Sequence, residues 1–389
     1  MTKLRTPVLL MIYCVGLLLL FDFIYTKFIL TIAPRPSLAD PVYSHRFKPN
    51  FSGQMRWGSN RYPMFTNSLG FRDASVREIP NETAHRRALV IGDSFTEGLG
   101  LPFEDTFAGK LYLAGQAAAD KTEFLNAGVS GYSPTIYYSK IKYLLERGLK
   151  FDEVIVASDI SDVQEEATSY FCIDEIPEYR AHCRSRSSAL GSMVRAGFFN
   201  FEPRDSFAIS DVLVNTIKHY LYWYTGITTH RIVHHNIRAG WTIPGSNVGD
   251  YFPLGVEGGI ERSVRHMQAL ADLLASRGIA LTIVVYPWPV QLHMDDRDSR
   301  QVKIWREFCI KNCKQFINAF PAFFAYKDAN SNEWYRDLYI HGDVHFSKKG
   351  NELLFDEIAK ELSDTHPPRR TLEKRTNGAP ISVKLSGLR

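Results

Sequence analysis

Residues 88–98 read ALVIGDSFTEG, an apolar run that stops at a short polar turn flanked by glycines. The first four residues, Ala88–Ile91, predict a short buried β-strand, and Gly92 marks the turn at its end. Ser94 follows directly, at the position beyond a parallel strand where functional side chains collect. Two questions follow: whether the remaining chain builds a parallel sheet, and whether Ser94 has catalytic partners.

Strands and helices alternate along much of the remaining sequence. Four further apolar runs predict strands, namely Phe124–Ala127, Val154–Ala157, Ile279–Tyr286 and Phe316–Phe320. Apolar residues spaced by three and four predict helices at Phe103–Ala119, Pro134–Arg147, Ile260–Ser276, Val302–Asn312 and Lys348–Leu362. Continuous apolar strands separated by helices indicate a parallel sheet that is covered on both faces. We therefore expect a doubly wound, flavodoxin-like, three-layer α/β/α sandwich with its functional residues at the carboxyl ends of the strands.

The composition is that of an ordinary globular protein. Of the 389 residues, 45% are hydrophobic and 23% are charged, which excludes a wholly disordered chain, a collagen-like repeat and a multi-span membrane protein. Lys and Arg number 46 against 42 Asp and Glu, and the whole excess lies in residues 364–389, an expected disordered basic tail. The rest of the chain has no net charge, which argues against nucleic-acid binding.

The first 32 residues have the features of a membrane anchor. Val8–Phe21 is uncharged and, counted to Tyr25, the apolar segment reaches the short end of a bilayer span. Lys3 and Arg5 precede it, which favours an amino end in the cytoplasm. A cleaved signal peptide has the same pattern, but no good cleavage site follows. We expect a single-pass anchor in the cytoplasmic membrane with the remainder exported, to the periplasm if the source is bacterial.

Three further segments complete the expected organisation. Residues 33–85 are interpreted as a stalk and lead-in, because their first half is rich in Pro, Ser and Asn. Residues 86–363 form the expected catalytic domain, with an insertion at about 165–259 that lacks clear alternation. The insertion holds an aromatic cluster of Tyr220, Tyr222, Trp223 and Tyr224. It is interpreted either as a cap over the sheet or as an ordinary helical packing layer.

Cysteine usage fits an exported protein. Four of the five cysteines form two close pairs, Cys172 with Cys183 and Cys309 with Cys313. This spacing permits disulfides without proving them, and it does not match that of zinc ligands. His230 and His234 lie four residues apart, but such pairs are usually surface or core histidines. We expect neither a metal nor a cofactor.

The turn around Ser94 differs from two common motifs. The nucleophile of the α/β-hydrolase fold lies in G-x-S-x-G, but Thr96 takes the place of the second glycine. A phosphate-binding loop needs Lys followed by Ser or Thr after its glycines, and neither follows here. Because a serine hydroxyl needs an adjacent base, Ser94 taken alone is more typical of a turn residue that only caps a helix.

A base and an acid occur together near the end of the chain. Residues 342–347, GDVHFS, immediately precede the last predicted helix. Asp343 and His345 are two residues apart and project to the same side of an extended chain. The acid can bond one ring nitrogen and leave the other free for a serine. His341 is a rival base, but it precedes the acid and lies further from the helix.

Two middle segments can supply donors for an oxyanion. Asn126–Tyr132, NAGVSGY, follows the second strand, and a glycine there can offer its backbone N–H at close range. Asp159–Asp162, DISD, follows the third strand and places polar side chains at the same edge of the sheet.

These blocks, in this order on alternating strands, resemble the SGNH (GDSL-like) hydrolase superfamily. Gly92–Ser94 is similar to its first block, Asn126–Gly131 to its second and Asp159–Asp162 to its third. Asp343–His345, together with Gly350, is similar to its fifth block. The resemblance covers about 88–362, apart from the insertion.

The resemblance implies roles for individual residues. It makes Ser94 the nucleophile, His345 the base and Asp343 its orienting acid, with Gly131 and the N–H of Ser94 as oxyanion donors. Ser161 stands where the family usually has an asparagine donor. The acid and base are spaced D-x-H instead of D-x-x-H, which resembles exported members that add or remove acetyl groups on polysaccharides.

The implied chemistry is acyl transfer through an acyl-serine intermediate. Water as the second nucleophile makes the protein an esterase, whereas a sugar hydroxyl makes it an O-acetyltransferase that would need a membrane partner to donate acyl groups. The anchor, the export and the aromatic cluster favour O-acetylated cell-envelope glycan as the substrate. The alternatives are a non-catalytic glycan-binding or scaffold protein, favoured by Ser161, and a lipase, disfavoured by the His and Arg content of the insertion.

Overall fold

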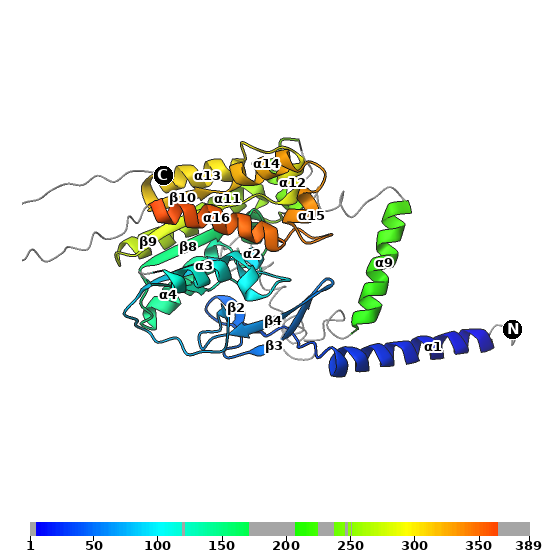
Figure 1. Cartoon of the computed structure of the whole chain (residues 1–389). Coiled ribbons are helices and arrows are strands. Elements are labelled where there is room, and N and C mark those ends of the chain that lie inside the picture. The colour runs from blue at the N-terminus through cyan, green and yellow to red at the C-terminus, as the bar shows by residue number, and fades with distance from the viewer. Residues whose placement is uncertain are drawn as a thin grey trace, which may run out of the picture.

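The computed structural model describes residues 5–118, 121–170, 207–224, 237–245, 248–249 and 251–364. Figure 1 shows the arrangement of the helices and strands. The predicted basic tail, most of the predicted insertion, Cys172, Cys183, His230 and His234 lie outside the described residues.

An eight-stranded sheet forms the centre of the molecule. Five strands run parallel: β6 (Arg86–Gly92), β7 (Thr122–Asn126), β8 (Glu153–Ser158), β9 (Ala280–Val285) and β10 (Gln315–Asn318). Three antiparallel strands extend it beyond β7: β3 (Ser52–Trp57), β4 (Asn60–Thr66) and β5 (Arg72–Asp73). The order is β10-β9-β8-β6-β7-β5-β4-β3. The parallel sheet predicted from the sequence is confirmed as the larger part of a mixed sheet.

Helices cover both faces of this sheet. α3 (Phe107–Ala117) packs on β7 and on α16 (Lys348–Asp364), and α4 (Pro134–Glu146), α5 (Asp162–Thr168) and α11 (Gly255–Ala275) pack together. α13 (Arg300–Asn312) packs against β9, β10 and α11. The chain crosses from β6 to β7 in one direction and from β7 to β8 in the other. Right-handed crossovers therefore place α3 and α4 on opposite faces, which confirms the three layers.

The parallel strands are buried because their side chains meet helices on both faces. Every residue of β8 is buried, and Val90, Ile155 and Val284 are fully enclosed. Such continuous apolar strands leave no wet face, which is why the sequence indicated them clearly. At the end of α13, Cys309 and Cys313 form a disulfide.

Residues 33–85 do not form the stalk that the sequence suggested. β1 (Ser37–Asp40) and β2 (Ser44–Phe47) form a hairpin, and β3 to β5 join the main sheet. Phe47, Tyr62 and Phe71 are buried in the hydrophobic core. The interpretation was wrong because half-buried antiparallel strands alternate apolar and polar residues, so their composition is polar. We call residues 32–73 the amino-terminal extension, and residues 86–364, apart from the predicted insertion, the body.

The expected anchor is helical. α1 (Arg5–Ile24) continues into a π-helical turn, η2 (Tyr25–Ile29), and is the one helix in the described part of the chain that is long and apolar enough to span a membrane. A signal sequence passes the same test. The chain enters the extension directly after this helix, since the N–H of Ala33 donates to the carbonyl of Gln54 in β3 over 2.8 Å.

Two parts of the predicted insertion are described, and they behave differently. α9 (Ala208–Tyr224) contacts α1 and stands apart from the body in Figure 1, so it is neither a cap over the sheet nor a packing layer on the body. The short helix η5 (Ile237–Thr242) packs at the carboxyl edge of the sheet, where the indole of Trp241 donates to the carbonyl of Ile160 over 2.9 Å.

Candidate active site

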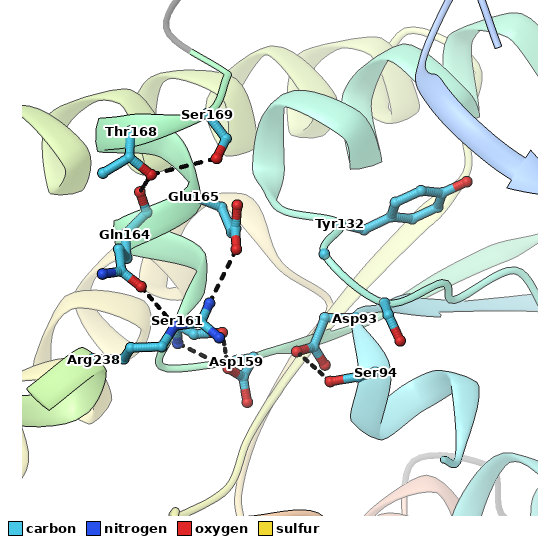
Figure 2. Close-up of polar contacts among 12 residues, drawn as sticks. Asp93, Ser94, Tyr132, Asp159, Ser161, Gln164, Glu165, Thr168, Ser169 and Arg238 are labelled. Carbon is cyan, nitrogen blue, oxygen red and sulfur yellow. Dashed lines mark hydrogen bonds and ion pairs between the residues drawn. The ribbon is translucent and has the colours of Figure 1, made fainter. Parts of the chain in front are cut away.

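Ser94 is the first residue of α2 (Ser94–Glu97), the short helix that begins where β6 ends (Figure 2). Asp93 caps this helix by accepting the N–H of Phe95 on Oδ1 over 3.0 Å. A side chain at Gly92 would collide with Thr96, because its Cβ would lie 2.1 Å from the Thr96 hydroxyl oxygen. The tight turn therefore presents a half-buried Ser94 at the point where the strand connections reverse direction, the usual ligand site of such sheets.

The structure brings the three residues of the predicted triad together. His345 Nε2 lies 2.9 Å from Ser94 Oγ, and His345 Nδ1 lies 2.6 Å from Asp343 Oδ1. A carboxylate accepts only, so Nδ1 carries the hydrogen and Nε2 is left to accept from the serine. His341, the rival base, has an exposed side chain, whereas the His345 side chain is buried.

The electrostatics of the pair favour a charged acid beside a basic imidazole. Burial opposes ionisation of both groups, but each stabilises the charge of the other. The net result is a pKa of Asp343 well below its ordinary value and a pKa of His345 above its ordinary value. Asp343 is thus a permanent anion at neutral pH, and it strengthens His345 as a base.

Trp57 of β3 completes the surroundings of the acid. Its indole N–H donates to Asp343 Oδ2 over 2.7 Å, on the oxygen that His345 does not use. Its ring also meets the imidazole of His345 edge-on, with 5.4 Å between the ring centroids. The sequence analysis missed Trp57, because a contact across 286 positions leaves no local pattern.

A second carboxyl group lies against Ser94. The Ser94 hydroxyl is 3.1 Å from Asp93 Oδ2. Burial and the neighbouring Asp159 raise the pKa of Asp93 to about 8, so Asp93 is mostly protonated at neutral pH. A neutral Asp93 competes weakly for the hydroxyl hydrogen of Ser94, which leaves that hydrogen to His345.

The loop that carries Gly131 is fixed by residues of α2 and of the amino-terminal extension. Glu97 Oε2 accepts the N–H and the hydroxyl of Ser130 over 2.8 and 2.7 Å, and Arg35 donates to the same oxygen over 2.5 Å. His45 Nε2 lies 2.8 Å from the Ser130 carbonyl. Gly131 has φ +81°, a left-handed conformation that favours glycine.

The two predicted backbone donors are the N–H groups of Ser94 and Gly131. Among the residues that the structure describes, the N–H groups of Ser94 and Gly131 donate no hydrogen bond to protein atoms. An N–H group at the carboxyl edge of a sheet that has no protein acceptor can serve a developing oxyanion.

Ser161 is not positioned as the oxyanion donor that its place in the sequence suggested. Its hydroxyl donates to Asp159 Oδ1 over 2.6 Å and its N–H donates to the same oxygen over 2.8 Å, and the residue is buried (Figure 2). The single hydroxyl hydrogen is therefore used inside the loop. The other oxygen of Asp159 accepts the indole N–H of Trp288 over 2.6 Å, a contact that the sequence analysis also missed.

One cleft lies away from these residues. It has a volume of about 760 Å³ and is lined by Trp241, Met294 and several charged side chains, but not by Ser94, Asp343 or His345. Its basic side chains are paired with acids, as in Arg300 with Glu257. Within the described part of the chain, no cluster of three His, Cys, Asp or Glu side chains could hold a metal ion.

Comparisons with known proteins give matches by structure. No family model matches the sequence, and no curated protein sequence matches it. Among solved structures, TesA is 10% identical at a TM-score of 0.39, over 72% of this chain and 99% of that chain. A catalytic mutant of Axe2, an acetylxylan esterase from Geobacillus stearothermophilus, is 12% identical at 0.38, over 73% and 97%.

A third match is a putative lipolytic protein of the G-D-S-L family from Desulfitobacterium hafniense DCB-2. It is 14% identical at a TM-score of 0.37, over 71% of this chain and 99% of that chain.

Proposed function

We propose that the protein is a serine-dependent ester hydrolase that works through an acyl-serine intermediate. The observation that carries the proposal is the line of contacts from Ser94 Oγ to His345 Nε2, over 2.9 Å, and from His345 Nδ1 to Asp343 Oδ1, over 2.6 Å. A serine bonded to an imidazole that a carboxylate orients is the arrangement that makes a serine hydroxyl nucleophilic.

In the first step, Ser94 Oγ attacks the ester carbonyl carbon while His345 Nε2 takes the hydroxyl proton. The tetrahedral intermediate collapses, the acyl–oxygen bond breaks, and His345 returns the proton to the leaving alcohol. Water then attacks the acyl-serine with His345 again as the base, which releases the carboxylic acid and restores Ser94. Asp343 stabilises the imidazolium that forms in each half of the reaction.

The N–H groups of Ser94 and Gly131 are the oxyanion donors in this proposal. Both lack a protein acceptor among the described residues, and the Gly131 loop is held by Glu97 and Arg35. One oxyanion donor typically contributes about 10²–10³ in rate. Two fixed backbone donors can therefore stabilise the oxyanion without the Ser161 hydroxyl. Ser161 has a structural role here, because its hydroxyl fixes Asp159.

The substrate that we propose is an acetyl ester on an exported glycan. The apolar α1 supports this, since a membrane anchor keeps the catalytic body near envelope polymers. Tyr220 does not support a sugar-binding cap, because α9 stands apart from the body (Figure 1) and the Tyr220 side chain is exposed.

The catalytic proposal is tested by replacing the nucleophile. Ser94→Ala should lower hydrolysis of p-nitrophenyl acetate by about 10³-fold or more and abolish labelling by a fluorophosphonate probe. Ser139→Ala, which removes a half-buried helix hydroxyl bonded to its own helix, is the matched control and should change neither. Activity of Ser94→Ala near the parent value would overturn the assignment, and absence of labelling in the parent would support the non-catalytic alternative.

The glycan proposal has a separate test. Mass analysis of envelope polysaccharide, with and without the protein, should show more O-acetyl groups when the protein is absent. Fewer O-acetyl groups would instead indicate the transferase, which uses the same three residues with a sugar hydroxyl in place of water. Unchanged acetylation would overturn the glycan proposal but leave the ester chemistry standing.

A further inference from the structure

α9 presents a large apolar surface that the described protein does not cover. Its large apolar side chains are between 37% and 67% exposed, namely Ile209, Val212, Leu213, Val214, Ile217, Tyr220 and Leu221. With 3.6 residues per turn, Ile209, Leu213, Ile217 and Tyr220 fall along one side of the helix. A contiguous apolar face of this kind marks a site of contact with another apolar phase.

A charged residue on the opposite side of α9 contacts the protein. Asp211 lies across the helix from Leu213 and pairs with Arg56 of β3 over 2.6 Å. Ala208, at the start of the helix, is buried. The rotation of α9 about its axis is therefore fixed, with the charged side towards the amino-terminal extension and the apolar side away from it.

The amino end of α9 is tied to the end of the apolar helix α1. Asp22 accepts the N–H groups of Ile209 and Ser210 over 2.9 and 2.6 Å, and the Thr26 hydroxyl accepts the N–H of Ala208 over 2.9 Å. Asp22 and Thr26 thus satisfy three of the backbone donors that a helix start leaves open. Both side chains are fully buried by this contact.

This contact places α9 at the level where α1 leaves the bilayer. α1 and η2 carry exposed apolar side chains between Val8 and Ile29, and Asp22 and Thr26 lie near the end of this helical segment, on the side of the folded extension. Figure 1 shows α9 running across the direction of α1, between the free end of α1 and the body. With α1 along the membrane normal, α9 lies in the plane of the membrane surface.

The length and pattern of α9 fit lying on a membrane. Its 17 residues are at the lower limit for a span, and one side carries the charge that pairs with Arg56. Amphipathic helices of this kind lie in the interface with their apolar side in the acyl boundary. The exposed surface of α1 and the apolar side of α9 meet at their contact, so a bilayer that surrounds one reaches the other.

We propose that α9 is an interfacial helix whose apolar face, centred on Leu213 and Ile217, is embedded in the outer surface of the same bilayer that α1 spans. Together, α1 and α9 hold the body at a fixed height and orientation above the lipid. The proposal rests on the anchor and is independent of the ester chemistry at Ser94.

The test uses the full chain in phosphatidylcholine vesicles, with and without bromine on the acyl chains. An environment-sensitive fluorescent amino acid is placed by codon suppression at position 217 in α9, and in separate preparations at position 113 in α3 or position 12 in α1. Ile217 and Leu113 are both 49% exposed and so form a matched pair, while Ile12 reports the anchor. Hydrolysis of p-nitrophenyl acetate at the parent rate shows that each protein is folded and reports Ser94 separately.

The probe at position 217 should emit at shorter wavelength in vesicles and lose on the order of half its emission when the lipid is brominated. The probe at position 113 should show neither change, and the probe at position 12 should show both. Equal responses at 217 and 113 would overturn the proposal. A blue shift at position 217 without quenching would mean that a second protein surface, and not lipid, covers α9. Absence of quenching at position 12 would mean that α1 does not enter the bilayer. Either result would also overturn the proposal.

Discussion

The body and the amino-terminal extension contribute different things to one site. The body supplies all three residues of the proposed reaction path, Ser94, His345 and Asp343. The extension supplies groups that hold this machinery from outside, such as Trp57 on the acid and Arg35 on the loop before Gly131. A parallel sheet can therefore place reacting groups at its edge while a separate group of strands fixes their orientation.

The extension also holds the nucleophile helix. Arg72 of β5 is buried and donates through its guanidinium to the carbonyls of Glu97, over 2.6 Å, and Gly98, over 2.5 Å, and also to that of Leu101. These carbonyls lie at the end of α2 and just after it, where no intrahelical donor remains. Arg72 therefore closes the carboxyl end of the helix that Ser94 begins.

The largest expected effect belongs to the body. Asp343→Asn should lower the rate of ester hydrolysis by about 10⁴-fold, because the amide favours the wrong imidazole tautomer. The parent's kcat/KM should fall as the pH drops through the pKa of His345, which lies above the ordinary value for histidine. Without the carboxylate that raises this pKa, the acid limb should move to lower pH.

A pH–rate profile of the residual activity checks the direction of this shift. Asp337→Asn, in α15 (Trp334–Leu338), alters a hydrogen bond that the Tyr326 hydroxyl donates to Asp337; it is the control and should leave the acid limb in place. If the acid limb of the pH–rate profile does not move in Asp343→Asn, the carboxylate does not raise the pKa of His345.

The next largest effect is on stability and belongs to the extension. Arg72→Met leaves the carbonyls of Glu97 and Gly98 without their donor inside the protein, and it should cost about 3 kcal/mol of unfolding free energy. Urea unfolding of the full chain in detergent measures the loss. Arg336→Met, at a side chain that is 76% exposed, should stay within about 0.5 kcal/mol of the parent. Equal losses in the two variants would remove the structural role of β5.

The smallest expected effect concerns the contact between the extension and the acid of the body. Trp57→Phe keeps an aromatic ring against His345 but removes the N–H on Asp343, and kcat/KM should fall about tenfold for one lost charge-assisted hydrogen bond. The carboxylate then concentrates more charge towards the imidazole, so the acid limb should move to higher pH, opposite to its movement in Asp343→Asn.

Trp305→Phe, a buried indole in α13, is the control for loss of an indole ring and should leave the acid limb unchanged. If Trp57→Phe lowers kcat/KM as much as Asp343→Asn does, the extension supplies a reacting group and does not only orient the residues of the body. If kcat/KM falls but the acid limb does not move, Trp57 acts only by packing.

The sequence predicted the body well and the extension poorly, for physical reasons. Strands such as β8 and β9 are buried on both faces and read as uninterrupted apolar runs. β4 alternates buried and partly exposed residues and contains Pro63, and the resulting polar composition resembles a linker. The pairing of Ser94 with His345 could be predicted from the sequence because both residues lie within recognisable blocks. Trp57 and Arg72 act through contacts that only the folded chain creates. The partner of Ser161 was equally inaccessible, because only the folded loop shows that Asp159 accepts its hydroxyl hydrogen.

The site joins residues that lie far apart in the sequence. Trp57 contacts Asp343, and Ser94 contacts His345 across 251 positions. A polypeptide delivered amino end first exposes Ser94 long before it delivers the imidazole. During synthesis, the hydroxyl of Ser94 therefore gains its imidazole partner only after 344 of the 389 residues have been made. A chain cut before His345 would therefore keep Ser94 but lack its imidazole partner.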